Sequence, residues 1–260
     1  MRTLLFVPGN RPDRFAKAAA SGADAVLCDL EDAVAPDAKS AARDAVVGWV
    51  RSEPAVVRVN AADTPWHAAD LAALRGLPGV LAVVLPKASP DAVAATASAL
   101  GEVPVWALIE TARGIRDADA IASVAARLVF GNVDFGLDAA VTATGPDERE
   151  LLYARSRLVI ASRAADLPAP LDGVTTDLDD PAAAATAARL SRNLGFGGKL
   201  CLHPKQVAAV REAFAPSAEE LAWARSVVEA AGSSEGAAVR VDGQMIDRPR
   251  LELARRLLAE

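Results

Sequence analysis

Two acidic residues each follow a short apolar run in the middle of the chain. Val105–Ile109 precedes Glu110, and Leu128–Gly131 precedes Asp134. The stretch between the two runs carries Ala and Ile at helical spacing, which predicts the order strand, helix, strand. A right-handed crossover between parallel strands brings both acids to the same edge of a sheet. We therefore expect the two carboxylates to face one cleft.

Such a pair of carboxylates could bind a metal ion. Two neighbouring carboxylates repel each other unless a cation or a shared proton offsets their charge. Two oxygen ligands that leave room for waters and for a substrate oxygen are typical of Mg²⁺ sites. Glu110 and Asp134 are therefore predicted to hold Mg²⁺. On this segment alone, the alternative that both acids cap the following helices stays open.

The whole chain repeats the same unit. Short apolar runs alternate with segments that carry Ala, Leu and Val at helical spacing, and eight such runs can be recognised. They are Leu4–Val7, Ala25–Asp29, Ala55–Val59, Leu81–Leu85, Val105–Ile109, Leu128–Gly131, Leu171–Val174 and Leu200–Leu202. Eight β-α units predict an α/β fold of the (β/α)₈ TIM-barrel type. The alternative is a doubly wound open sheet, but the turn after the first run lacks the G-x-G-x-x-G spacing.

Polar and charged residues gather where these strands end. In a TIM barrel the functional groups lie at the carboxyl ends of the strands. The groups that follow the runs are Asn10 and Arg11, Asp29 to Asp32, Arg58 and Asn60, Lys87, Glu110, Asp134, Thr175 to Asp177, and His203 to Lys205. Their position favours the barrel and predicts one site at its carboxyl-end face.

Composition excludes several classes of protein. The chain has 260 residues, is 52% apolar and carries a net charge of −6 without a basic run, so neither nucleic acid nor a membrane is an expected partner. Cys28 and Cys201 lie in apolar runs and are predicted to be buried core residues. They indicate a protein of a reducing compartment. The first apolar run is too short for a signal peptide, and no run is long enough to span a membrane. A cytoplasmic protein is expected.

The last part of the chain has a different pattern. Residues 216–234 form an amphipathic helical stretch, a β-hairpin is predicted around Asp242 and Gly243, and a terminal helix follows. We expect residues 1–214 to form the barrel. Residues 215–260 are expected to form a helix–hairpin–helix lid or arm.

Seven ordered sequence blocks then point to a family. They are LFVPGNRPDRFAKA, DLEDAV, VRVN, ALIET, GNVDFG, GFGGKLCLHPKQV and GQMIDRP, and they cover nearly the whole chain. The sequence resembles the citrate lyase β-subunit-like group, which is related to malyl-CoA and citramalyl-CoA lyases. The resemblance implies a TIM barrel that assembles as a homotrimer or a dimer of trimers. It also implies Mg²⁺-dependent cleavage or formation of a carbon–carbon bond next to a CoA thioester.

The resemblance assigns roles to four residues. Glu110 and Asp134 match the metal ligands, and Arg58 matches a catalytic arginine that binds substrate and stabilises the enolate of the thioester. An ion pair between Arg58 and a nearby acid is compatible with that role. Asp247 matches an aspartate that reaches from the lid into a neighbouring subunit and transfers a proton. The alternative is that Asp247 caps the helix that begins at Arg248.

Further residues are implied to contact the substrate or its surroundings. Glu31 and Asp32 match a loop beside the metal that holds its waters, although Asp29 or Asp32 could equally cap the next turn. Arg11 and Lys17 are implied to bind the CoA phosphates, with Arg14 in the same cluster. Weaker predictions concern four more residues: Lys87 and Lys199 as anion-binding cations, His203 as a structural group and His67 as a surface-loop residue.

The predicted function is therefore a Mg²⁺-dependent lyase. It would cleave a 3-hydroxy-carboxyacyl-CoA, such as citramalyl-, malyl- or citryl-CoA, into an acyl-CoA and a 2-oxo acid. Three alternatives remain: the β subunit of an acyl-carrier-dependent citrate lyase, a synthase or thioesterase that hydrolyses the CoA thioester, and a barrel that binds a 2-oxo acid without turnover.

Overall fold

The computed structural model describes residues 1–145, 147–232, 239–241 and 243–259. The chain divides into two compact units, Met1–Phe214 and Ala215–Glu260, and each is described by itself.

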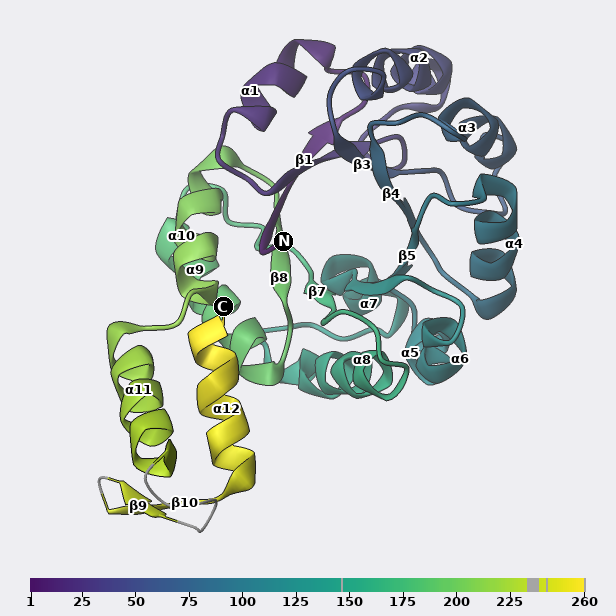
Figure 1. Cartoon of the computed structure of the whole chain (residues 1–260). Coiled ribbons are helices and arrows are strands. Elements are labelled where there is room, and N and C mark those ends of the chain that lie inside the picture. Colours follow the sequence, from purple (N-terminus) through teal and green to yellow (C-terminus); the bar gives the residue numbers. More distant parts are fainter. Residues whose placement is uncertain (146, 233–238, 242, 260) are drawn as a thin grey trace. The chain divides into compact units, whose positions relative to one another are not determined.

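The first unit is a closed barrel of eight parallel strands (Figure 1). The strands are β1 (Thr3–Pro8), β2 (Ala25–Asp29), β3 (Ala55–Arg58), β4 (Val80–Leu85), β5 (Val105–Ile109), β6 (Arg127–Phe130), β7 (Leu171–Asp172) and β8 (Gly198–Cys201). Each pairs with the next in sequence, and β8 closes the ring on β1 with Leu4 opposite Leu200. The prediction of a (β/α)₈ TIM barrel is confirmed, and the open doubly wound sheet is wrong.

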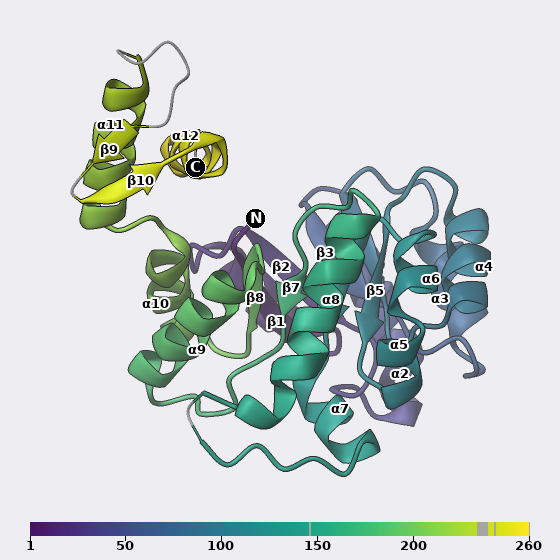
Figure 2. The ribbon, with the colours of Figure 1, turned by 90° about the horizontal axis from the view of Figure 1, so that it is seen from below.

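Helices cover the outside of the strands (Figure 1). They are α1 (Phe15–Ala19), α2 (Lys39–Val50), α3 (His67–Leu74), α4 (Pro90–Leu100), α5 (Ala112–Arg116), α6 (Ala118–Ala122), α7 (Asn132–Asp138), α8 (Leu152–Ala164), α9 (Pro181–Leu194) and α10 (Pro204–Phe214). Short 3-10 turns occupy Pro12–Arg14, Pro36–Ala38 and Arg149–Leu151. Of the helices, α7 is the exception, because in the side view it lies beyond the strands at the lower end of the barrel (Figure 2).

Local sequence explains where the helices begin. Before α4, the Ser89 hydroxyl accepts a hydrogen bond from the Ala92 N–H, and Pro90 occupies the first helical turn. Asp180 caps α9 in the same way, again with a proline directly after it. A polar cap satisfies N–H groups that have no partner inside the helix, and proline lacks one of those N–H groups. These signals set the residues at which α4 and α9 begin.

The strands are apolar on both faces because both faces are buried. Alternate residues such as Leu27, Val84 and Leu108 form an inner cluster, whereas Val26, Val83 and Ile109 belong to a larger outer cluster that includes helix residues. Two-sided burial is why these strands read as continuous Val, Leu and Ala runs instead of alternating patterns. Cys28 and Cys201 are free and fully buried, as expected from the sequence.

The shortest strand differs from the prediction. The run Leu171–Val174 was expected to be a strand, but only Leu171–Asp172 is one. The Asn132 side chain takes both backbone groups of Val174: its Nδ2 donates to the Val174 carbonyl at 3.0 Å and its Oδ1 accepts from the Val174 N–H at 2.9 Å. A side-chain amide therefore replaces two rungs of the ladder between β6 and β7.

The second unit contains α11 (Ala218–Gly232), the strand pair β9 (Val239–Val241) and β10 (Gln244–Ile246), and α12 (Arg248–Ala259). The two strands are antiparallel, as the predicted hairpin requires, and Asp242 at its turn lies outside the described residues. Its small core is built on Ala224, Val227, Ile246 and Ala254. No helix in the described parts of the chain is both long and apolar enough to cross a membrane.

Candidate active site

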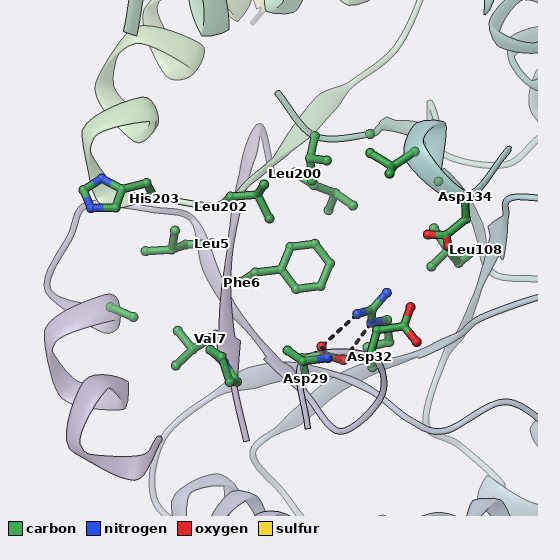
Figure 3. Close-up of a pocket in the computed structure, with 18 of the residues that line it drawn as sticks. Leu5, Phe6, Val7, Asp29, Asp32, Leu108, Asp134, Leu200, Leu202 and His203 are labelled. Carbon is green, nitrogen blue, oxygen red and sulfur yellow. Dashed lines mark hydrogen bonds and ion pairs between the residues drawn. The ribbon is translucent and has the colours of Figure 1, made fainter. Parts of the chain in front are cut away.

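A cavity of about 690 Å³ opens at the carboxyl ends of the barrel strands. Its wall includes both predicted metal carboxylates, Glu110 and Asp134, together with Arg58. Figure 3 shows Asp29 and Asp32 on one side of this cavity and Asp134 on another, with the Phe6 ring pointing into it. The topology thus brings these side chains, which are far apart in the sequence, to one place.

Arg58 is a buried cation that is held from two sides. Its Nε and Nη2 donate to the two carboxylate oxygens of Asp29 at 2.7 and 2.8 Å, and these bonds are drawn as dashed lines in Figure 3. Its Nη1 lies 3.0 Å from Glu31 Oε2, and its guanidinium lies over the Phe6 ring, 5.0 Å from the centroid. Burial opposes the charge, but Asp29 and Glu31 outweigh it and raise the pKa of Arg58. The guanidinium is therefore charged and fixed in orientation.

The loop after β2 is built around the same ion pair. Besides binding Arg58, the Asp29 carboxylate accepts from the backbone N–H groups of Glu31 and Ala33 at 2.9 and 3.1 Å. The buried Lys39 ammonium donates to the carbonyls of Leu30 and Glu31, both at 2.7 Å. The loop conformation is thus tied to the position of the arginine.

Glu31 and Asp32, two neighbouring acids of this loop, differ in where they lie. Asp32 is exposed and lines the cavity. Glu31 is buried and is not among the lining residues. It bridges two cations, because its Oε2 lies beside Arg58 and its Oε1 accepts from Lys87 Nζ at 2.8 Å.

Glu110 is buried among like charges. Its Oε1 accepts from the Lys87 backbone N–H at 2.8 Å. Burial, together with the nearby charges of Glu31 and Asp134, raises the pKa of Glu110 to about 8. Thr111, not Glu110, caps α5, since the Thr111 hydroxyl accepts from the Gly114 N–H at 2.9 Å. The capping interpretation is therefore wrong for Glu110, and a cation beside its carboxylate would offset the repulsion from Glu31 and Asp134.

Asp134 reaches the cavity from the first turn of α7. It is half-buried and lines the wall beside Asn132, whose bonds to Val174 anchor the start of this helix. The structure gives no side-chain cap to α7, so Asp134 is not its capping residue. Its carboxylate contributes to the negative charge around Glu110.

The donor set fits one kind of metal. Among the described residues, no three His, Cys, Asp or Glu side chains converge as a ready-made cluster, which is what a structural zinc site would need. Two carboxylates that face open space in a cavity, one of them with a raised pKa, match Mg²⁺, which keeps several water or substrate ligands. The residues present therefore fit a magnesium ion.

Lys87 has an unusual backbone at the end of β4. Its φ angle is +49°, in the left-handed region that costs a residue with a Cβ about 1–2 kcal/mol. In this conformation its N–H reaches Glu110 and its ammonium reaches Glu31. A strained residue thus contacts two acids of the site.

The cations after β1 separate into two groups. Arg14 and Lys17 are exposed and line the cavity. Arg11 is not among the lining residues, and its Nε and Nη2 donate to Asp13 at 2.9 and 2.7 Å. The implied phosphate-binding role of Arg11 and Lys17 stays a prediction.

Three other predicted residues lie in different settings. His203 lines the cavity and accepts a hydrogen bond at Nδ1 from the Lys205 N–H at 3.2 Å. Lys199 does not line it, because this lysine is buried against Asp172 at 3.3 Å. The prediction of His67 as a surface-loop residue was wrong: it begins α3, is partly buried and bonds the Asn60 carbonyl at 2.8 Å.

Asp247 belongs to the second unit and directly precedes α12. Its carboxylate accepts from the Arg250 N–H at 3.3 Å, and its carbonyl accepts from the Leu251 N–H at 3.0 Å. It therefore occupies the helix-capping position that the sequence left open as an alternative. A capping carboxylate keeps free lone pairs, so this position does not prevent proton transfer.

Three residues that shape the site escaped the sequence analysis. They are Lys39, which holds the loop after β2, Asn132, which anchors α7, and Gly131, which allows close approach of Glu110. Only Gly131 carried a signal, since a glycine directly after a buried strand often marks close backbone contact.

Comparison with known proteins agrees with this architecture. The family model described as HpcH/HpaI aldolase/citrate lyase matches residues 2–204. A citrate lyase subunit beta-like protein from Deinococcus radiodurans is 40% identical over 278 residues, covering 100% of this chain and 96% of the relative. A (3S)-malyl-CoA thioesterase from Cereibacter sphaeroides is 32% identical, covering 100% of this chain and 94% of the relative.

The solved structures give the same result. The crystal structure of CitE from Mycobacterium tuberculosis in complex with magnesium, acetoacetate and coenzyme A matches with a TM-score of 0.86 and 38% identity. The match covers 99% of this chain and 97% of that one. The chain therefore belongs to the HpcH/HpaI aldolase/citrate lyase family, whose named activities make or break carbon–carbon bonds.

Proposed function

We propose that the protein is a Mg²⁺-dependent lyase that cleaves a 3-hydroxy-carboxyacyl-CoA into an acyl-CoA and a 2-oxo acid. Citramalyl-, malyl- and citryl-CoA are the candidate substrates. The observation that carries the proposal is the buried Arg58 guanidinium on the wall of the same cavity as Glu110 and Asp134. A fixed positive charge in the same cavity as the two carboxylates that we propose as metal ligands supports this reaction.

The substrate class follows from the charges. A 3-hydroxy acid offers a carboxylate and a neighbouring oxygen, and Mg²⁺ held by Glu110 and Asp134 would polarise that oxygen when bound. As the carbon–carbon bond breaks, the hydroxyl group loses its proton to water and becomes the oxo group of the 2-oxo acid. The electron pair of the broken bond moves to the thioester as an enolate, with its negative charge on the thioester oxygen. Arg58 is preorganised to stabilise that charge, because Asp29 and Glu31 already fix its orientation. One such donor contributes about 3 kcal/mol of transition-state stabilisation.

The enolate must then gain a proton at the acyl carbon. We assign this step to Asp247, supplied by the second unit of a neighbouring subunit in a homotrimer or a dimer of trimers. Asp32 would orient water in the cavity, and Arg14 and Lys17 would attract the CoA phosphates, whereas Arg11 is already paired with Asp13. The two free thiols suit a reducing compartment, which supports a cytoplasmic location.

The test is to incubate the purified protein with Mg²⁺ and each of the three thioesters and to measure release of the 2-oxo acid. Glu110→Gln and Asp134→Asn should lower kcat/KM at least about 100-fold and abolish tight Mn²⁺ binding. Asp44→Asn, which changes an exposed acid on α2, is the matched control and should behave like the wild type. Full activity of Glu110→Gln would overturn the metal assignment, and no release from any thioester would overturn the function.

A second candidate is hydrolysis of the CoA thioester, which is favoured by the relatives named (3S)-malyl-CoA thioesterase. A thiol reagent distinguishes the two activities, since a lyase leaves the acyl-CoA intact and a thioesterase releases free CoA. If the protein is instead the β subunit of an acyl-carrier-dependent complex, it should cleave carrier-bound thioesters much faster than CoA thioesters.

A further inference from the structure

Lys87 adopts a backbone conformation that its residue type does not favour. Its φ angle of +49° lies in the left-handed region, where glycine and asparagine are found far more often than lysine. Such strain persists only where the surroundings hold the residue firmly, and it gathers at functional sites. A lysine at this position therefore indicates that its side chain has a role that glycine could not have.

Two hydrogen bonds of Lys87 indicate its role in the site. The Lys87 backbone N–H donates to Glu110 Oε1 at 2.8 Å, and its Nζ donates to Glu31 Oε1, also at 2.8 Å. The side chain is 46% exposed, and Lys87 is not among the residues that line the cavity. Lys87 therefore touches two acids of the site from outside the space that a substrate would fill.

The contact with Glu31 extends to the arginine. Glu31 Oε2 lies 3.0 Å from Arg58 Nη1, and Arg58 is bound by Asp29 through two further bonds. Without the ammonium, Arg58 would be the one cation within ion-pair distance of the buried Glu31 carboxylate among the residues that the structure describes. Glu31 would then be free to turn away from Arg58 toward solvent, and the guanidinium would lose one of the two acids that hold it.

We propose that Lys87 is a positioning residue that links Glu110 to the ion pair of Glu31 and Arg58. Its backbone N–H orients Glu110, and its ammonium holds Glu31 against Arg58. This inference rests on the proposed function, because it assumes that Glu110 binds the metal and that Arg58 stabilises the enolate. The two contacts can be separated by experiment, since every side-chain substitution except proline keeps the N–H.

The test compares Lys87→Met, Lys87→Arg and Lys87→Asn. Lys87→Met should lower kcat about 10- to 100-fold, as loss of a group that orients an active-site residue does, with KM changed less than about threefold. Mn²⁺ should bind Lys87→Met at least as tightly as the wild type, because the N–H to Glu110 remains and a nearby positive charge is gone. Lys87→Arg should restore part of kcat, because it keeps the charge.

Lys87→Asn tests the strain. Asparagine tolerates the left-handed region, so this variant should melt at a higher temperature than Lys87→Met while losing as much kcat. Asp166→Gly is the matched control, because Asp166 has a similar φ of +53° but its side chain is 90% exposed and lies outside the site. It should leave kcat unchanged.

A readout without turnover keeps this inference separate from the proposed function. In urea, the destabilisation caused by Lys87→Met and by Glu31→Gln should sum to more than that of the double variant, because the two residues form one ion pair. Additive effects together with wild-type kcat in Lys87→Met would overturn the positioning role. A wild type that binds Mn²⁺ but cleaves no thioester would overturn the proposed function instead.

Discussion

Gly131 lies so close to Glu110 that a side chain at position 131 would collide with it. A Cβ built on Gly131 would lie 2.5 Å from Glu110 Cβ and 2.6 Å from Glu110 Oε2. The Gly131 N–H also donates to the Ile109 carbonyl at 3.0 Å, so its backbone cannot retreat without breaking the pairing of β5 and β6. Gly131, which follows β6, thus sets the orientation of the Glu110 carboxylate, which follows β5.

Gly131→Ala should therefore displace the Glu110 carboxylate. We expect the affinity for Mn²⁺ and the value of kcat/KM to fall at least about tenfold, because a metal ligand moved by a fraction of an ångström binds poorly. Metal titration followed by steady-state kinetics measures both effects. Unchanged metal affinity in a folded Gly131→Ala variant would contradict this view of the site.

Gly48→Ala is the matched control for that substitution. Gly48 lies inside α2, and among the described residues a Cβ built on it meets no atom within 4 Å apart from its chain neighbours and the nearby backbone of its own helix. Alanine is favoured over glycine in a helix by about 1 kcal/mol, so this variant should be equally active and slightly more stable. A loss of activity in Gly48→Ala would mean that the kinetic assay reports on something other than the site.

The fold could be predicted because each strand and helix is indicated by the residue pattern of its own segment. The expected runs Ala25–Asp29 and Val105–Ile109 coincide with β2 and β5, since strands buried on both faces are continuous apolar segments. The seventh strand was predicted too long for a reason that is not local. Asn132 takes the Val174 backbone groups, and nothing in the sequence around Val174 reveals that bond across the chain.

The site could be predicted only in part for the same reason. The topology alone brings Arg58, Glu110 and Asp134 to one cavity, because each follows or ends a barrel strand. Which cation pairs with which acid depends on side-chain geometry. Arg11 turns to Asp13 instead of the cavity, and the strained backbone of Lys87 has no counterpart in the sequence pattern.

The two groups of cations after β1 lead to a second prediction. Arg14→Ala and Lys17→Ala should each raise KM for a CoA thioester about fivefold, the effect expected from one exposed ion pair with a phosphate. Arg11→Ala should leave KM unchanged, because Arg11 already pairs with Asp13.

A pantetheine thioester, which lacks the nucleotide phosphates, supplies the comparison. With this substrate, the KM values of Arg14→Ala and Lys17→Ala should equal that of the wild type. If Arg11→Ala raises KM for the CoA thioester as much as the other two variants, then Arg11 leaves Asp13 to bind the ligand.

The cysteines should be unreactive in the native protein. Cys28 and Cys201 are fully buried, and burial raises the pKa of both thiols to about 12. Compared with an ordinary pKa near 9, the fraction of reactive thiolate falls about 1000-fold. A thiol reagent at pH 8 should modify neither residue over an hour and both in guanidinium chloride. Rapid modification without denaturant would show that the barrel opens near one of these strands.

Asp172 is a buried acid on β7 that lies between two buried cations, Arg155 and Lys199. Its Oδ1 accepts from Arg155 Nε at 3.0 Å, its Oδ2 lies 3.3 Å from Lys199 Nζ, and the Ser191 hydroxyl donates to Oδ2. Burial alone would raise the pKa of Asp172, but the charges of Lys199 and Arg155 outweigh it and lower the pKa to about 2. Since the folded value lies below the unfolded value of 3.8, the pair stabilises the fold above pH 4.

That stabilisation should disappear in acid. A pKa that falls from 3.8 to about 2, at about 1.4 kcal/mol per unit, gives about 2.5 kcal/mol in total, and about 2 kcal/mol of this is lost as pH decreases from 5 to 2. Asp172→Asn should cost about 3–5 kcal/mol at pH 7, because it removes the counter-charge beside the buried Lys199 and leaves the buried Arg155 with Glu148 alone. The difference between this variant and the wild type should shrink by about 2 kcal/mol toward pH 2.

Guanidinium unfolding at a series of pH values measures this difference directly. Asp44→Asn, which removes an exposed acid on α2, should follow the wild type at every pH. A constant gap between Asp172→Asn and the wild type would mean that Asp172 titrates normally in the folded protein. In that case Lys199 and Arg155 would have to be stabilised by other groups, and the buried cluster would not be the acid-sensitive part of the barrel.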